Sequence, residues 1–204
     1  APGWTLDLLN STTKRRFFKT HANVKDLPAG SAPGVKVIYI ARNPKDVCVS
    51  LFHHAKNKPD FEFTGKFDDM LHLFAEGRAE NSSWFDHVLE WYEASKVDPE
   101  HVLFLCYEDM LANPSASVGK IADFVGIAYD DQLLEKVCES SSISSMKGNK
   151  KVAQVVGFSH IRKGGAGGWR DVFTVRQSEA FDALYKASME GTGLTMNFGE
   201  GVVM

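Results

Sequence analysis

Residues 35–50 of the chain read VKVIYIARNPKDVCVS, and this stretch decides the fold class. Its β-branched and aromatic run, 37–40, predicts a short strand that is covered on both faces. Asn43 is a favourable N-cap residue, and Pro44 then occupies the first helical position, where its missing N–H costs nothing. Asp46 follows where a carboxylate can bond back to the cap and meet the positive end of the helix dipole. The stretch therefore predicts a buried strand, a sharp turn and the start of a helix.

This predicted turn is suited to binding an anion. A helix that begins at the carboxyl end of a parallel strand is a natural anion site. Arg42 stands at its mouth and can bind a phosphate with two N–H groups at once. Ser50 lies two helical turns beyond the cap, on the same helix face as Asn43. An ordinary capped helix without a ligand is the plainer alternative, because strand-to-helix turns are common in α/β folds.

The rest of the chain alternates between strand and helix patterns. Apolar runs predict a short strand at 15–20 and a second buried strand at 102–107. Helical spacing and capping residues predict helices over 44–56, 68–76, 84–92, 114–126, 130–138 and 175–189. This order predicts an α/β fold with a mainly parallel central sheet flanked by helices, and residues 1–204 form one domain of ordinary size.

Composition narrows the functional class. The formal net charge of −3 argues against a general nucleic-acid binder. No run of 18 or more apolar residues occurs, so no membrane partner or membrane span is expected. The three cysteines, Cys48, Cys106 and Cys138, are widely spaced and form no CxxC pair. We therefore expect reduced thiols in a cytoplasmic protein, with neither a disulfide framework nor a metal site.

The segment 140–170 has an unusual charge pattern. No acidic residue lies between Glu139 and Asp171, and glycines recur throughout. The basic residues of the segment are Lys147, Lys150, Lys151, Arg162, Lys163 and Arg170. Glycine allows a backbone to approach a ligand closely, and Lys and Arg neutralise anions. The segment is either a second anion-binding element or a flexible solvated stretch.

Other residues are candidates for catalysis or ligand binding. His21 could act as a general base, with Lys19 stabilising negative charge, although the residues alone favour a surface histidine at a strand end. Tyr107 ends a predicted strand at the carboxyl edge of the sheet, where ligands of α/β proteins bind, or it is a core tyrosine. The serines of 140–145 either cap a helix or contact a nucleotide.

Together these motifs resemble the cytosolic sulfotransferases, which transfer a sulfuryl group from 3′-phosphoadenosine 5′-phosphosulfate (PAPS) to a hydroxyl or amine. The likeness runs from Arg16 to about Phe198. It rests on motifs in the family order: Lys19-Thr20-His21, Arg42 through Ser50, Phe104 through Met110, Arg162-Lys163-Gly164 with Gly167-Gly168-Trp169, and the spacing of Arg170, Thr174, Val175 and Glu179. The resemblance implies a fold like that of P-loop NTPases.

The resemblance also implies roles for single residues. His21 would take the proton of the acceptor, and Lys19 would help to stabilise the transition state. The 3′-phosphate would be held by Arg42, Ser50, Arg162, Lys163 and Gly164. The adenosine would be surrounded by Tyr107, Ser141, Ile143 and Met146. The segment Arg170–Glu179 would form a homodimer contact.

The chain also departs from the family pattern. The family has a strand and a loop that grips the 5′-phosphosulfate upstream of the Lys-Thr-His motif. We find no such segment, and therefore expect the fold to be N-terminally incomplete. Ile143 stands where the family has an aromatic residue that would stack on adenine.

The sequence predicts a PAPS-dependent sulfotransferase that needs no metal and releases 3′-phosphoadenosine 5′-phosphate (PAP). Its acceptor would be a small hydrophobic molecule bound by His53, His54, Phe61, Phe63 and the 67–74 region. The alternative from another class is a non-catalytic module that binds the 3′-phosphorylated nucleotide or dimerises. A P-loop kinase is disfavoured because the pattern G-x-x-x-x-G-K-[ST] is absent.

Overall fold

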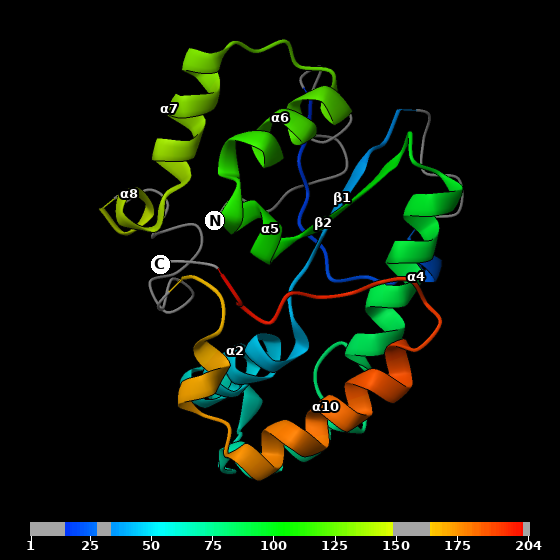
Figure 1. Ribbon diagram of the computed structural model, residues 1–204, viewed down its shortest axis with the longest axis vertical. Coiled ribbons are helices and arrows are strands. Elements are labelled where there is room, and N and C mark those ends of the chain that lie inside the picture. The colour runs from blue at the N-terminus through cyan, green and yellow to red at the C-terminus, as the bar shows by residue number, and fades with distance from the viewer. Residues whose placement is uncertain (1–14, 28–33, 149–163, 202–204) are drawn as a thin grey trace.

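The computed structural model describes residues 15–27, 34–148 and 164–201. Within these ranges two strands, β1 (Val37–Ala41) and β2 (Val102–Cys106), form a parallel pair. Their register places Val37 opposite Val102 and Ala41 opposite Cys106. Both strands therefore end at the same edge of the sheet, and Figure 1 shows them side by side. The predicted α/β architecture with a parallel sheet is confirmed.

The connection between the strands contains three helices. They are α2 (Pro44–Asn57), α3 (Phe67–Ala75) and α4 (Trp84–Val97). Short 3-10 turns, η1 (Val24–Asp26) and η2 (Pro59–Phe61), precede β1 and α3 respectively. The helical spacing predicted in α4 has the expected packing role, because Trp84, Val88 and Trp91 are all buried.

The helices after β2 divide between two parts of the molecule. The first group comprises α5 (Tyr107–Ala112), α6 (Pro114–Val125), α7 (Asp131–Ser141) and α8 (Ile143–Gly148). The chain then returns through η4 (Gly168–Asp171) to α10 (Val175–Met189). Figure 1 shows α6 and α7 at one end of the molecule, with α2 and α10 at the other. The helix predicted at 130–138 is α7, which continues to Ser141 because nothing in 139–141 breaks it.

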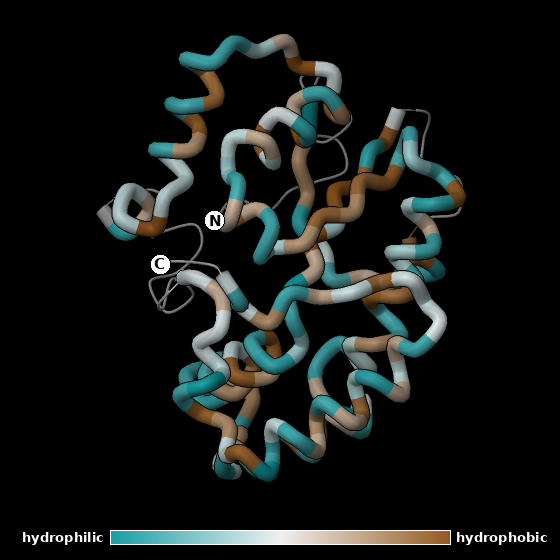
Figure 2. The backbone as a smooth tube through the Cα atoms, viewed as in Figure 1, coloured by the Kyte–Doolittle hydropathy of each residue, from teal (hydrophilic) through white to brown (hydrophobic). Residues whose placement is uncertain are grey.

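The hydrophobic core lies mainly among α2, α3, α4 and α10. Its buried members include Val49 from α2, Phe74 from α3, Val88 from α4 and Phe181 from α10. In Figure 2 these helices alternate between hydrophilic and hydrophobic colour, as expected for helices that bury one face. Among the described residues, no helix has the length and apolar character needed to cross a membrane.

The prediction that β1 is covered on both faces is wrong within the described ranges. Ile38 and Ile40 remain 36% and 50% exposed, whereas Ala41 is buried. The side chain of Tyr39 stacks on Trp91 and on Phe104. The described helices thus cover the Tyr39 face of β1, while Ile38 and Ile40 on the opposite face are exposed.

The predicted strand at 15–20 is also not formed. These residues have no regular secondary structure, and Phe17 and Phe18 are 80% and 72% exposed. Two adjacent aromatic residues point to opposite sides of an extended chain, so this pair gives no single face for packing on the sheet. The next carbonyl groups, those of His21 and Ala22, instead accept hydrogen bonds from side chains of α4.

Candidate functional site

The start of α2 is organised by Asn43, as its sequence predicted. The Asn43 side-chain oxygen accepts a hydrogen bond from Asp46 N at 2.9 Å. Its side-chain nitrogen donates to Asp46 Oδ2 at 2.9 Å and to Glu108 Oε1 at 2.8 Å. The Asn43 backbone N–H also donates to Glu108 Oε1, at 2.9 Å. Glu108, the second residue of α5, therefore locks the turn from across the sheet edge.

Glu108 was not singled out by the sequence. Its side chain is completely buried, and Oε2 has no hydrogen-bond partner among the described residues. The available signal was an acidic residue directly after an apolar strand. That position lies at the same sheet edge as the Asn43 turn, since parallel strands end together.

Arg42 brings the two anion-suited segments together. Its Nη2 donates to the carbonyl of Gly165 at 3.0 Å and lies 3.4 Å from Asp46 Oδ2. Its guanidinium carbon is 4.9 Å from the centre of the Tyr107 ring, a cation–π distance. Its Nε is buried and has no partner in the described part of the chain. Arg42, Tyr107 and the glycine-rich segment thus meet at the carboxyl edge of the sheet.

The glycine loop, defined here as residues 164–169, is attached to α2 through Asp46. The backbone N–H of Gly167 donates to Asp46 Oδ2 at 2.8 Å, and that of Trp169 donates to Oδ1 at 2.9 Å. Gly164 packs directly on Ile143 of α8, and any side chain at this glycine would collide with Ile143 Cδ1. The loop therefore joins α2 to the predicted adenosine side of the site.

The remaining predicted nucleotide residues are less directly connected. Ser50 is exposed on α2, and Met146 is half-buried in α8. The hydroxyl of Ser141 is exposed and donates to the Val137 carbonyl of its own helix at 2.6 Å. Arg162 and Lys163 lie outside the described residues.

Lys45 connects the start of α2 to α10 and to the ring of Trp169. It is 1% exposed, and its Nζ donates to Ser178 Oγ at 2.7 Å and lies 2.6 Å from Asp182 Oδ1. Nζ also stands 4.2 Å from the centre of the Trp169 ring. No sequence pattern assigned a role to Lys45, because its polar partners Ser178 and Asp182 lie on α10, far along the chain.

The Lys-Thr-His segment, residues 19–21, lies against α4. The side chains of Lys19 and His21 are both exposed. The His21 carbonyl accepts a hydrogen bond from His87 Nε2, and the Ala22 carbonyl accepts one from Trp91 Nε1, each at 3.2 Å. The segment is therefore held by its main chain, which leaves the two candidate catalytic side chains open to solvent.

Tyr39 fixes the ring of His87. Its hydroxyl lies 2.9 Å from His87 Nδ1. Burial raises the pKa of Tyr39 well above its ordinary value, so the hydroxyl keeps its proton. With Tyr39 donating to Nδ1, His87 carries its own proton on Nε2 and donates it to His21. The sequence pattern assigned the stripe of residues 84–91 to the core. The two ring N–H groups at positions 87 and 91 lie one helical turn apart, and this spacing was a signal that they could bind a neighbouring segment.

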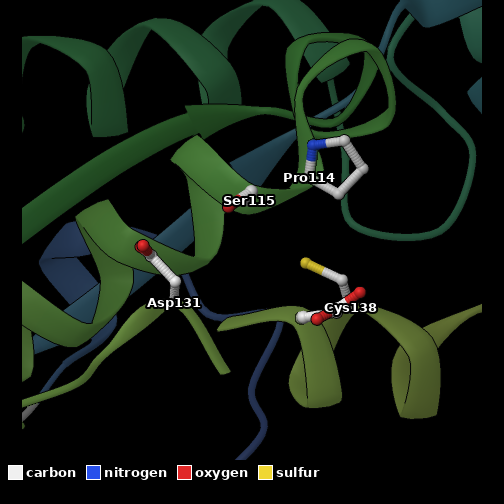
Figure 3. Close-up of a pocket in the computed structure, with 5 residues that line it drawn as sticks. Pro114, Ser115, Asp131 and Cys138 are labelled. Atoms are coloured by element: carbon white, nitrogen blue, oxygen red, sulfur yellow. The ribbon is translucent and has the colours of Figure 1, made fainter. Parts of the chain in front are cut away.

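None of the predicted site residues is a cysteine, and none lines the open pocket between α6 and α7. Burial raises the pKa of the Cys48 thiol to about 12 and that of Cys106 to about 11. Figure 3 shows the pocket between α6 and α7, a cavity of about 440 Å³ lined by Pro114, Ser115, Asp131, Glu135 and Cys138. Across the described ranges, no three His, Cys, Asp or Glu side chains gather as metal ligands would.

Comparison with known proteins decides the family. The family described as Sulfotransferase domain matches residues 3–193. The chain belongs to the sulfotransferase family. It is 38% identical to sulfotransferase 1A1 of Canis lupus familiaris, over 93% of this chain and 67% of that protein. It is 34% identical to sulfotransferase 1B1 of Mus musculus, over 93% of this chain and 66% of the relative. The chain thus spans about two thirds of the length of these curated relatives.

Solved structures confirm the sulfotransferase fold. Mouse sulfotransferase SULT7A1 complexed with PAP superposes with a TM-score of 0.81 at 36% identity, covering 91% of this chain and 69% of that one. Retinol dehydratase in a complex with retinol and PAP gives a TM-score of 0.82 at 32% identity, covering 93% and 58%. The family resemblance of the sequence is confirmed, and both of these structures contain PAP.

Proposed function

We propose that the protein transfers a sulfuryl group from PAPS to a hydroxyl or amine of a small hydrophobic acceptor and releases PAP. The observation that carries the proposal is the hydrogen bond from Arg42 to Gly165, which joins segments 123 residues apart. One segment is a helix start and the other is rich in glycine, and both suit a phosphate. They meet where ligands of parallel α/β sheets bind.

The nucleotide would lie along this edge. The 3′-phosphate is assigned to Arg42, Ser50, Arg162, Lys163 and Gly164, and the adenosine to Tyr107, Ser141, Ile143 and Met146. The Nε of Arg42 is buried and has no partner among the described residues, which supports the assignment, because a buried donor gains most from an anionic acceptor. The contact between Ile143 and Gly164 supports a continuous surface from adenosine to phosphate.

The chemistry depends on the Lys-Thr-His segment. PAPS, when bound, supplies an activated sulfuryl group. His21 accepts the proton of the acceptor as the acceptor oxygen or nitrogen bonds to sulfur and the bond between sulfur and the phosphate oxygen breaks. Lys19 stabilises the negative charge that develops on the leaving oxygen. The exposure of both side chains supports these roles, since an acceptor can reach them.

An aromatic cluster supports a hydrophobic acceptor. Phe52 makes edge contacts with Phe63 and Phe67, at centroid distances of 6.2 and 5.6 Å, and His54 contacts Phe61 at 5.4 Å. Retinol dehydratase has been solved with retinol and with androsterone, each in the presence of PAP. Both ligands are hydrophobic alcohols, and we propose the same class here.

Two assays test this function. The protein is titrated with PAP by calorimetry, and is then incubated with radiolabelled PAPS and a panel of phenols, alcohols and amines. We expect saturable PAP binding and labelled product with hydrophobic members of the panel. Binding without transfer to any acceptor would identify the non-catalytic nucleotide-binding module instead. Absence of both would refute both readings.

We further propose that the protein works in the cytoplasm as a homodimer through Arg170–Glu179. Val175, at the start of α10, supports this contact because it is 76% exposed. Light scattering measures the mass directly, and a monomer at micromolar concentration would contradict the dimer.

A further inference from the structure

The Asp46 carboxylate, at the start of α2, accepts hydrogen bonds from three groups and forms an ion pair. It is 3% exposed. Its Oδ1 accepts from Trp169 N at 2.9 Å, and its Oδ2 accepts from Gly167 N at 2.8 Å and from the Asn43 side chain at 2.9 Å. Arg42 Nη2 lies 3.4 Å from the same Oδ2. A single side chain therefore contacts both the guanidinium of Arg42 and the backbone of the glycine loop.

The glycine loop has little freedom on its other side. Gly167 has φ +83°, a conformation that glycine adopts without strain. Behind it, a Cβ at Gly199 would stand only 2.6 Å from Gly167 N, so the two backbones are in close contact. The loop is thus enclosed between Gly199 and the carboxylate of Asp46. The bond from Arg42 to the Gly165 carbonyl then ties the guanidinium to the same loop.

We propose that Asp46 is a positioning residue that holds the glycine loop against Arg42 and thereby sets affinity for the 3′-phosphate of the nucleotide. The inference rests on the proposed function and extends it to a residue that does not itself bind the nucleotide. Without the carboxylate, Gly167 and Trp169 lose a charged acceptor, and Arg42 loses an ion-pair partner. The damage falls mainly on the contacts to the 3′-phosphate, since the adenosine is assigned to Tyr107, Ser141, Ile143 and Met146.

The chain provides a matched control on another helix. Asp86 is the third residue of α4, as Asp46 is of α2, and each donates its backbone N–H to the side chain of the N-cap residue. Asp86, however, is exposed. The change Asp86→Asn therefore reproduces the effect of a lost charge in the first helical turn without touching the glycine loop.

The test compares two nucleotides that differ by one phosphate. Dissociation constants for PAP and for adenosine 5′-phosphate, which lacks the 3′-phosphate, are measured by calorimetry or displacement for the protein and for Asp46→Asn and Asp86→Asn. We expect Asp46→Asn to weaken PAP at least 10-fold and adenosine 5′-phosphate less than 2-fold. Asp86→Asn should change neither constant by more than 2-fold.

Each outcome separates the inference from the proposed function. If the unchanged protein does not bind PAP, the proposed function fails first. If it binds PAP and Asp46→Asn binds equally well, or loses both nucleotides equally, Asp46 has no role specific to the 3′-phosphate. Hydrogen exchange of 164–171 in the unchanged protein gives a second measurement should Asp46→Asn fail to fold. Exchange there should slow with PAP and not with adenosine 5′-phosphate, and equal slowing by both would overturn the inference.

Discussion

The start of α2 and the Lys-Thr-His segment are built in opposite ways. Around the start of α2, the polar and charged side chains of Asn43, Lys45, Asp46 and Glu108 are each no more than 3% exposed. In the segment 19–21 every side chain is exposed, and the contacts to α4 are made by backbone carbonyls. The first region fixes side chains inside the protein, whereas the second is attached to α4 by its main chain and leaves its side chains exposed.

The difference suggests how variants in the two regions should differ. Removing a buried, hydrogen-bonded side chain leaves its buried partners unsatisfied, which costs about 1–3 kcal/mol. Changes at the start of α2 should therefore affect nucleotide affinity and stability together. Changes at 19–21 remove exposed groups and should affect turnover while stability stays nearly constant.

The largest effect is expected for His21→Ala. Loss of a general base lowers turnover by about 10²–10⁴-fold. The dissociation constant for PAP should stay within about twofold, because His21 lies outside the region assigned to the nucleotide. Product formation from labelled PAPS and calorimetry with PAP measure the two quantities. Turnover that survives the change would show that another group takes the proton.

A large but smaller effect is expected for Arg42→Ala. Hydrogen bonds to charged groups contribute about 1.5–3 kcal/mol, which corresponds to about a 10- to 150-fold loss of PAP affinity. Arg78→Ala is the control, since Arg78 forms an exposed ion pair with Glu76 at 3.0 Å. Equal PAP affinity in Arg42→Ala and Arg78→Ala would remove Arg42 from the phosphate site.

The sequence predicted the local parts of this site well. Asn43, Pro44 and Asp46 form the expected capped helix start because their signals lie within one helical turn. It did not predict the partners of these residues. Glu108 bonds Asn43 across 65 positions, and Trp169 bonds Asp46 across 123 positions. Such contacts depend on which strands end at the same edge of the sheet and on the path of the chain from α8 back to α2. Local sequence patterns carry information about neither.

The failed strand at 15–20 has a related cause. Its residues have the apolar and aromatic character of a strand, but strand formation needs a neighbouring strand as well as propensity. In the described ranges β1 pairs with β2 and the segment runs free of both. The following residues, His21 and Ala22, are instead held by the ring N–H groups of His87 and Trp91 on α4. A strand pattern contains no information about such side-chain donors.

Alkaline pH offers a third test, directed at the buried side of α2. Burial raises the pKa of Cys48 from 9.0 to about 12, so between these values the unfolded chain loses a proton that the folded protein keeps. The contribution of this thiol to the free energy of unfolding therefore falls as pH rises above about 9. Between pH 7.5 and pH 10 the loss from this thiol is on the order of 1 kcal/mol.

Urea unfolding of the protein and of Cys48→Ala at both pH values measures this term. Cys48→Ala starts from lower stability because a buried group is removed, but its stability should fall less over the interval, by a difference on the order of 1 kcal/mol. Cys138→Ala, which changes a thiol in α7, is the control. Identical pH dependence in Cys48→Ala and the unchanged protein would mean that Cys48 does not titrate as its burial requires.

The smallest effect is expected for His87→Phe, which tests the main-chain support of the catalytic segment. Phenylalanine keeps a ring beside Tyr39 but can neither accept from the Tyr39 hydroxyl nor donate to the His21 carbonyl. A typical hydrogen bond contributes about 0.5–1.5 kcal/mol, so turnover should fall about 2- to 10-fold with PAP affinity unchanged. His87→Gln can still offer an N–H and should recover part of the loss. If His87→Phe instead weakened PAP binding as much as turnover, the two regions would not be separable, because a change on α4 would then reach the nucleotide.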